Sequence, residues 1–165
     1  MLKQKIDAEY VHISDVAWQP LPEGFAIGGG QWKLLHVSPE LGSWAAMFAF
    51  PKGSSVTSHI HVGPGEYFLT KGKLEVRGGS MSGGDTAVAP GYGYEPCNAR
   101  HDKTDFLEDS EIYMSFIGPL QILDESPARG GNYSVGQQQY WFPGIPSFLD
   151  GLRNPLLGLL PSRGL

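Results

Sequence analysis

Two histidines separated by a single residue, His59 and His61, carry the clearest chemistry in this sequence. In a β-strand, residues i and i+2 point to the same face, so both imidazoles would aim the same way. Residues 62–65 are typical of a turn, and they predict a hairpin with Glu66 opposite His61 and Phe68 opposite His59. Two imidazoles suit Zn, Cu, Fe or Ni, and an added carboxylate also makes Fe(II) and Mn(II) reasonable. Such histidine pairs also occur by chance on surface strands.

The residues around this pair extend it to a longer motif. From Gly53 to Glu66 the chain resembles the first motif of the cupin superfamily, G-x5-H-x-H-x3,4-E-x6-G, with both histidines in register. The closing glycine, Gly72, comes one residue early, which predicts a tighter turn. The resemblance implies a small jelly-roll barrel with a metal at its centre.

The second cupin motif, G-x5-P-x-G-x2-H-x3-N, is matched only at its beginning, by Gly84 and Pro90. Tyr92 stands where that motif has glycine, and Glu95 stands where it has histidine. The next histidine along the chain is His101. This departure from the second motif helps to identify which group within the superfamily the chain resembles.

Residues 61–79, 89–104 and 116–120 look like the 2,4'-dihydroxyacetophenone dioxygenase group of cupins. Residues 32–53 are similar to the broader group that holds acetylacetone-cleaving dioxygenase and zinc-binding anti-sigma domains. Both resemblances are to proteins of the same superfamily, so they imply the same barrel.

The narrower resemblance implies three histidine ligands, which map onto His59, His61 and His101. Residues 91–100 would then form a long loop that returns His101 to the metal. Glu95 is the rival third ligand, because it occupies the usual motif position. Glu66 is either a further ligand or the carboxylate to which a bound histidine donates its second N–H.

The resemblance implies a non-haem Fe(II) dioxygenase, with Zn, Ni and Mn as alternative metals. Its substrates would be O2 and an aromatic α-hydroxyketone, whose C–C bond is cleaved without an external reductant. Glu66 or Glu95 would take the substrate proton. A β-diketone-cleaving dioxygenase is the alternative that uses the same site. A zinc-binding cupin sensor without turnover is the alternative from a different class.

An aryl ketone also needs apolar walls around the metal. Aromatic side chains close to the motifs, or alternating on one face of a predicted strand, are the candidates: Trp44, Phe48, Phe68, Tyr94 and Phe116, with Phe50 and Met114 as further ones.

Short strands must position these residues. The chain has 23 Gly and 13 Pro among 165 residues, with 41% hydrophobic residues, which indicates a folded chain that turns often. The resulting prediction is an all-β barrel whose strands cover residues 31–37, 43–50, 54–61, 66–70, 73–78, 84–90, 111–118 and 137–142. A short helix is expected at 146–153, where Pro146 suits a first helical position.

Length and composition bound the remaining properties. We expect one domain over residues 1–142, with its metal motifs at 53–101, and an apolar Gly/Pro-rich tail at 143–165. A net charge of −5 without clustered Lys or Arg argues against nucleic acid as a partner. The single cysteine, Cys97, the absence of a signal-peptide pattern and the lack of any long apolar run predict a cytoplasmic protein that does not enter membranes. A homodimer is the expected oligomer.

Overall fold

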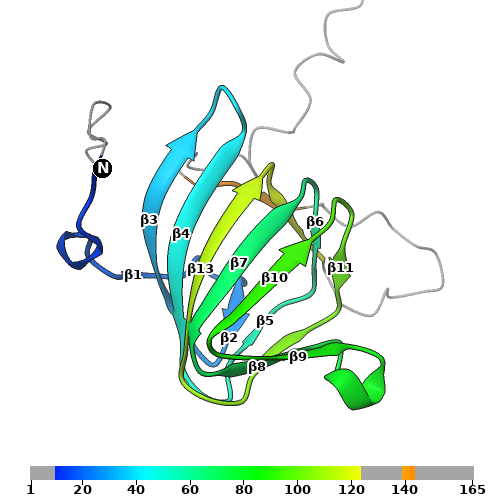
Figure 1. The fold of residues 1–165 in the computed structure, drawn as a ribbon. Coiled ribbons are helices and arrows are strands. Elements are labelled where there is room, and N and C mark those ends of the chain that lie inside the picture. Colours follow the sequence, from blue (N-terminus) through cyan, green and yellow to red (C-terminus); the bar gives the residue numbers. More distant parts are fainter. Residues whose placement is uncertain (1–9, 124–138, 144–165) are drawn as a thin grey trace, which may run out of the picture.

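A computed structural model describes residues 10–123 and 139–143, and within them the protein is built almost entirely of strands (Figure 1). The two helices in this described part of the chain are 3-10 turns of three residues each, η1 (Ile13–Asp15) and η2 (Ser80–Ser82). The strands are β1 (Gln19–Pro20), β2 (Ala26–Ile27), β3 (Gln31–Ser38), β4 (Ser43–Phe50), β5 (Ser55–Val56), β6 (His59–His61), β7 (Gly65–Lys71), β8 (Lys73–Val76), β9 (Asp85–Val88), β10 (Gly91–Glu95), β11 (Arg100–His101), β12 (Thr104–Phe106), β13 (Ser110–Ile117), β14 (Leu120–Ile122) and β15 (Gln139–Trp141). In this part of the chain, no helix has the length needed to cross a membrane.

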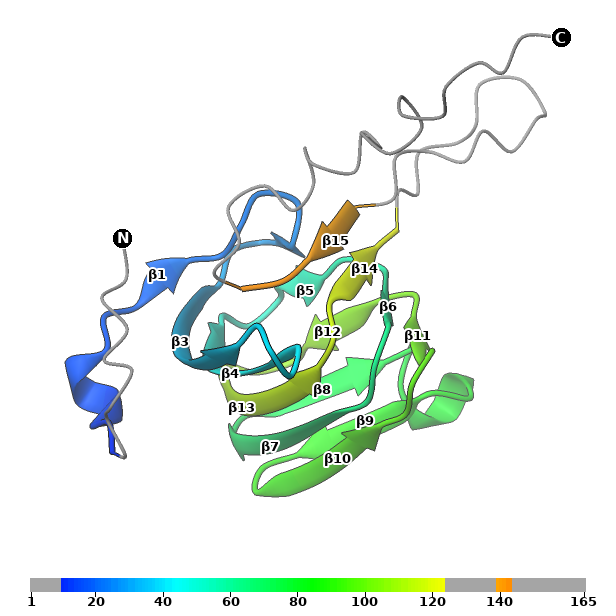
Figure 2. The same cartoon turned by 90° about the horizontal axis from the view of Figure 1, so that it is seen from above.

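The strands form antiparallel sheets that curve around a common interior. One sheet has six strands in the order β1-β3-β4-β13-β7-β10. A four-stranded sheet, β11-β6-β14-β15, and a five-stranded sheet, β2-β5-β12-β8-β9, complete the arrangement. Seen from above, β4, β13 and β7 lie on one side of the interior, and β14, β6 and β11 lie across from them (Figure 2). This confirms the predicted all-β jelly-roll barrel.

Side chains of β4 fill much of the interior. On β4, Trp44, Ala46, Phe48 and Phe50 are all buried. The buried core continues with residues of the neighbouring and facing strands: Leu69, Leu74, Val76, Phe106, Ile112, Phe116 and Leu120. Aromatic rings dominate this core, and it surrounds the site described below.

The predicted pairing of the two histidines with residues 66–70 is wrong. Strand β6 pairs with β11 and β14, whereas β7 pairs with β10 and β13. The residues between β6 and β7 carry the chain from one sheet to another, because Val62 donates to Pro119 and Pro64 accepts from Ile117 instead of pairing with each other. A Cβ on Gly63 would lie 2.1 Å from the Ile117 carbonyl oxygen, so the crossing is also tightly packed.

Other predictions agree with the structure within a few residues. The segments at 31–37, 43–50 and 111–118 correspond to β3, β4 and β13, and the last predicted strand contains β15. The segment 54–61 is divided into β5 and β6. The early motif glycine, Gly72, is the only residue between β7 and β8 and has φ +89°.

The loop expected at residues 91–100 and the helix expected near the end of the chain remain to be compared with the structure. Residues 91–100 are not one long loop, because 91–95 form β10 and lie against β7. The short helix expected at 146–153 and most of the predicted tail lie outside the described residues.

Candidate metal centre

Strand pairing brings the three histidines to one place. His59 and His61 lie on β6 with Ile60 between them, and His101 on β11 pairs directly with His59. All three imidazoles are buried. The backbone N–H of His61 donates to Ala99, and its carbonyl accepts from Asn98. These bonds fix the loop that leads into β11, and so they hold His101 beside the β6 pair.

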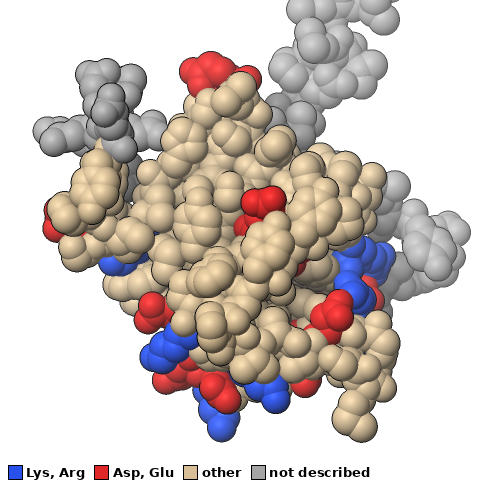
Figure 3. All heavy atoms as spheres, in the orientation of Figure 1, with Lys and Arg blue, Asp and Glu red and all other residues tan. Residues whose placement is uncertain are grey.

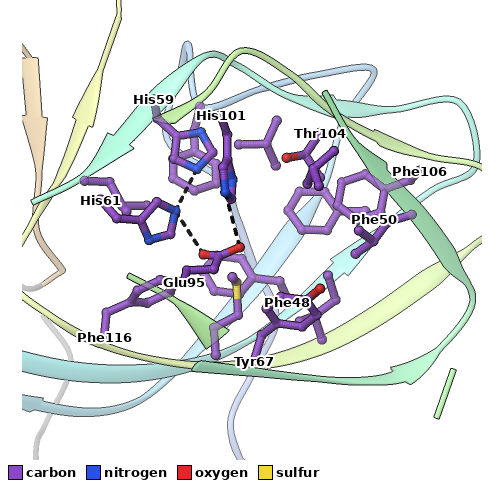
Figure 4. Close-up of a pocket in the computed structure, with 17 residues that line it drawn as sticks. Phe48, Phe50, His59, His61, Tyr67, Glu95, His101, Thr104, Phe106 and Phe116 are labelled. Carbon is purple, nitrogen blue, oxygen red and sulfur yellow. Dashed lines mark hydrogen bonds and ion pairs between the residues drawn. The ribbon is translucent and has the colours of Figure 1, made fainter. Parts of the chain in front are cut away.

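The imidazole nitrogens converge on a common point inside the barrel (Figure 4). One ligand atom from each of His59, His61 and His101 lies within 4.8 Å of the other two. The Nε2 atoms of His59 and His61 are 3.1 Å apart. The Nδ1–H of His59 donates to the Thr57 carbonyl at 2.7 Å, which leaves its Nε2 with a free lone pair.

Glu95, at the end of β10, completes the polar cluster. Its Oε2 lies 3.0 Å from Nε2 of His61, and its Oε1 lies 3.6 Å from Nε2 of His101. Alternation along β10 turns Glu95 inward together with Gly93, whereas Tyr92 and Tyr94 face outward. The structure therefore brings together both rival third ligands that the sequence suggested.

Burial determines the charge of the histidines. Desolvation lowers the pKa of His59. Desolvation, followed by the proximity of the other two imidazoles, lowers the pKa of His61 to about 2. Desolvation first, and His59 next, lower the pKa of His101 to about 4. All three imidazoles are therefore neutral near pH 7, the state in which they can bind a metal.

The carboxyl group responds to the same burial in the opposite direction. Desolvation raises the pKa of Glu95 to about 7, and the positive charge of Arg77 opposes this shift. A carboxyl group with such a pKa can both accept and release a proton under ordinary conditions.

These residues fit a divalent metal ion. Nitrogens 3.1 Å apart can share an ion at the bond length of about 2.1 Å that imidazole makes with zinc. Among the described residues, Oε2 of Glu95 is a buried atom without a hydrogen-bond partner, and it lies 3.0 Å from Nε2 of His61, where the imidazole nitrogens meet. Unsatisfied buried oxygen and nitrogen atoms are costly unless a ligand, an ion or water completes them. The three histidines can hold the ion, with Glu95 beside it.

The cavity around this cluster is mostly apolar. It leaves about 50 Å³ for the centres of water-sized molecules, several times the space that one water needs. Besides the histidines and Glu95, its walls are Phe25, Phe48, Phe50, Val56, Tyr67, Leu74, Val76, Thr104, Phe106, Ile112, Met114, Phe116 and Leu120. The structure thus places the predicted Phe48, Phe50, Met114 and Phe116 in the cavity wall.

Other predicted site residues lie elsewhere. Glu66 is exposed on the outer face of β7, so the expected approach of its carboxylate to the histidines does not occur. Phe68 and Tyr94 also face outward, with 45% and 59% of their surface exposed. Trp44 is buried in the core against Phe116 and does not line the cavity. Glu66 and Phe68 were expected near the histidines only because a hairpin between residues 59–61 and 66–68 was predicted, and that hairpin does not form.

Sequence reasoning missed Tyr67, Thr104 and Phe106 as cavity residues. Tyr67 has the parity of Leu69, a strongly apolar residue on the same strand, and this alternation is the signal that could have identified it. Thr104 and Phe106 lie on the short strand β12, whose position depends on pairing with β5 and β8.

Replacing Gly93 with Ala is expected to disturb the cavity without touching a histidine. A Cβ at this position would lie 2.1–2.6 Å from side-chain atoms of Tyr67. Such overpacking typically costs about 1–3 kcal/mol, because the Tyr67 ring would have to move. Thermal unfolding of Gly93→Ala should show the loss, and Gly93→Ala/Tyr67→Ala should recover part of it. The contact would be contradicted if the double variant were as unstable as Gly93→Ala, or if its loss of stability equalled the sum of the losses in the two single variants.

Acidification is expected to destabilise the metal-free protein. Unfolded histidines take up protons below about pH 6.5, whereas folded His101 does so near pH 4 and His61 near pH 2. The unfolded state therefore binds more protons in this window, and the free energy of unfolding falls as the pH falls. Glu95 acts in the opposite sense between pH 4.5 and about 7, but it is one group against three.

Urea unfolding of chelator-treated protein at about pH 7 and about pH 5 measures this loss. The matched variant is His101→Asn, which removes one of the buried histidines and should lose less stability on acidification. An equal pH dependence in both proteins would contradict the role of His101.

Comparison with known proteins agrees with this geometry. Residues 7–121 match the ChrR cupin-like domain family. The chain is 56% identical over 124 residues to the acetylacetone-cleaving enzyme of Acinetobacter johnsonii, which covers 75% of this chain and 81% of that protein. A crystal structure of a putative acetylacetone dioxygenase from Methylibium petroleiphilum PM1 has 58% identity and a TM-score of 0.71, covering 86% of this chain and 94% of that one. The structure of an acetylacetone dioxygenase from Acinetobacter johnsonii has 51% identity and a TM-score of 0.70, covering 86% and 91%. The chain therefore belongs to the ChrR cupin-like family of the cupin superfamily, in the group that contains the acetylacetone-cleaving enzymes.

Proposed function

We propose that this protein is a metal-dependent dioxygenase that uses O2 to cleave a C–C bond of a small β-diketone. The observation that carries the proposal is the cluster of three buried, neutral imidazoles in an apolar cavity. It occurs in a chain 56% identical to an acetylacetone-cleaving enzyme. The protein is thus an oxidoreductase that needs no organic cofactor, since the diketone itself supplies the electrons for O2.

His59, His61 and His101 are the proposed metal ligands. Their neutral nitrogen donors suit Fe(II), which we take as the metal, and they also suit Zn, Ni and, with an oxygen donor, Mn. When bound, the metal supplies a Lewis acid and a template on which a chelating diketone and O2 can meet. Thr57 supports this ligand set, because its carbonyl holds the His59 ring in the tautomer that presents Nε2.

Glu95 is the proposed proton acceptor. The central C–H of a β-diketone is acidic, because its anion is delocalised over both carbonyl oxygens. A buried carboxyl group with a pKa of about 7 is suited to removing that proton. Glu95 is adjacent to two of the proposed ligands, at 3.0 Å from His61 and 3.6 Å from His101, so its carboxyl group would be next to an ion held by the histidines.

The aromatic walls bind the apolar parts of the substrate and exclude water. Phe48, Phe50, Phe106 and Phe116 surround the cavity, and the ring of Phe116 lies 5.1 Å from that of His61. The small free volume suits a compact diketone. The aromatic α-hydroxyketone expected from the sequence is the second candidate, and this phenyl-rich lining is the observation that favours it.

Metal analysis coupled to oxygen uptake tests the proposal. Purified protein loaded with Fe(II) should consume one O2 for each acetylacetone that disappears. It should turn over aromatic α-hydroxyketones more slowly. Uptake only with the hydroxyketones would replace the main proposal by the second candidate. Zinc at full occupancy, with no uptake from any substrate after exchange for iron, would favour the non-catalytic sensor instead.

A further inference from the structure

The turn between β10 and β11 connects two residues of the site that belong to different sheets. Glu95 ends β10 in the six-stranded sheet, and His101 lies on β11 in the four-stranded sheet. Between them, residues 96–99 form a turn in which the N–H of Ala99 donates to the carbonyl of Pro96 at 3.0 Å. The path of the backbone through this turn therefore affects where the His101 imidazole lies.

Hydrogen bonds attach the turn to the chain at the second histidine of β6 and directly after it. The N–H of Asn98 donates to the His61 carbonyl at 2.8 Å, and the N–H of His61 donates to the Ala99 carbonyl at 2.9 Å. The Cys97 thiol donates to the Val62 carbonyl at 2.9 Å. Asn98 and Ala99 thus both face His61. Two residues opposite one is the pattern of a β-bulge, which bends a strand and re-aims its side chains beside many active sites.

Asn98 occupies the position of this bulge that usually requires glycine. Its φ is +64°, in the left-handed region, and in one common bulge the first residue is a glycine in that conformation. Among residues with a Cβ, asparagine is one of the few that adopt the left-handed region readily. The Asn98 side chain is exposed, so packing in the core does not explain the choice of residue.

The turn is held without ion pairs. Residues 96–99 carry no charged side chain. Figure 3 shows an uncharged surface at the upper ends of β10 and β11, with Lys and Arg side chains gathered below it. Its position therefore depends on the hydrogen bonds to residues 61 and 62 and on the backbone conformation of Asn98.

We propose that Asn98 is a positioning residue for the metal, because its left-handed backbone maintains the bulge that directs His101 towards His59 and His61. The inference rests on the proposed three-histidine site and adds to it a residue that does not touch the ion. A residue that disfavours the left-handed region would let the turn relax in the metal-free protein. Metal binding would then have to restore the bulge, and the cost of that conformation would appear as weaker binding.

The test is titration of the metal-free full chain with Co(II), a divalent ion that imidazole ligands bind and whose visible absorption reports binding. Asn98→Ala should raise the Co(II) dissociation constant about 5-fold. This is the lower end of the roughly 5–30-fold that the left-handed region costs an ordinary residue, because asparagine bears part of that cost as well. Asn98→Gly should stay within about twofold of wild type, because glycine adopts the conformation freely. Circular dichroism checks that each metal-free variant is folded.

Gly83→Ala is the matched control. Gly83 follows η2 between β8 and β9, has φ +81°, and a Cβ there would meet nothing within 4 Å. The substitution introduces the same backbone strain away from the histidines, so it should lower the melting temperature and leave the Co(II) dissociation constant within about twofold of wild type.

The outcomes separate this inference from the site on which it rests. Equal Co(II) affinity in wild type and Asn98→Ala would overturn the role of Asn98. So would an equal weakening in Asn98→Gly or in Gly83→Ala, since either would show that the effect does not follow the left-handed backbone at this turn. A wild-type chain that binds no Co(II) would overturn the three-histidine site, and this inference with it.

Discussion

Replacing His101 with Ala is expected to remove the metal and abolish oxygen uptake, as are His59→Ala and His61→Ala. Each variant takes one neutral nitrogen from a set of three that lie within 4.8 Å of one another. Losing an outer-shell partner typically costs about 10–100-fold in metal affinity or activity, and losing a direct ligand should cost more. Metal content by mass spectrometry and oxygen uptake with acetylacetone measure both effects.

His36→Ala is the control for these variants, because His36 is an exposed histidine on β3. It should retain metal and activity within about twofold, as most surface substitutions do. A His101→Ala protein with full metal content would contradict the three-histidine site. That result would indicate that Glu95, whose Oε2 is 3.0 Å from Nε2 of His61, is the third ligand.

Local patterns were sufficient for the parts of the fold that depend on neighbours in sequence. Alternation along 43–50 predicted that Trp44, Phe48 and Phe50 share a face, and the ring centroid of Phe48 lies 6.4 Å from that of Trp44 and 6.0 Å from that of Phe50. The i, i+2 spacing predicted that His59 and His61 point the same way, and their Nε2 atoms are 3.1 Å apart. Strand geometry alone determines both results.

Pairing between distant strands could not be predicted in the same way. A turn-like segment at 62–65 looks the same whether the chain reverses within one sheet or crosses to another. The outcome depends on contacts of Gly63 and Pro64 with Ile117, far along the chain. Because a strand has a period of two, this error placed Glu66 and Phe68 inside when the inward residues are Tyr67 and Leu69.

The position of Glu95 also could not be predicted from local sequence patterns. Glycine and tyrosine alternate before it, a composition typical of a loop. The glycine at 93 is needed because a side chain there would collide with Tyr67, and the segment is in fact β10. The resemblance identified His101 and Glu95 as rivals for one position. Folding places them 3.6 Å apart, so both can serve one site in different roles.

Glu95→Gln is expected to keep the metal and lose most of the turnover. The amide has the shape of the carboxyl group but cannot accept the substrate proton, and loss of a general base typically costs about 10²–10⁴-fold in rate. On acidification the wild-type rate should fall as Glu95 is protonated, and the Gln variant should lack this dependence. In the metal-free protein, burial raises the pKa of Glu95 to about 7. A bound cation shifts the transition to lower pH, since positive charge favours the carboxylate.

Varying the acidity of the substrate distinguishes a role of Glu95 as the base from a purely structural role of this residue. A diketone with electron-withdrawing substituents has a more acidic central C–H and depends less on a base, so Glu95→Gln should lose less rate with it than with acetylacetone. Glu66→Gln is the matched control, because Glu66 is exposed on the outer face of β7, and its rate should stay within about twofold of wild type. Loss of metal from Glu95→Gln would instead make Glu95 a ligand. An equal loss of rate with both diketones would remove its role as the base.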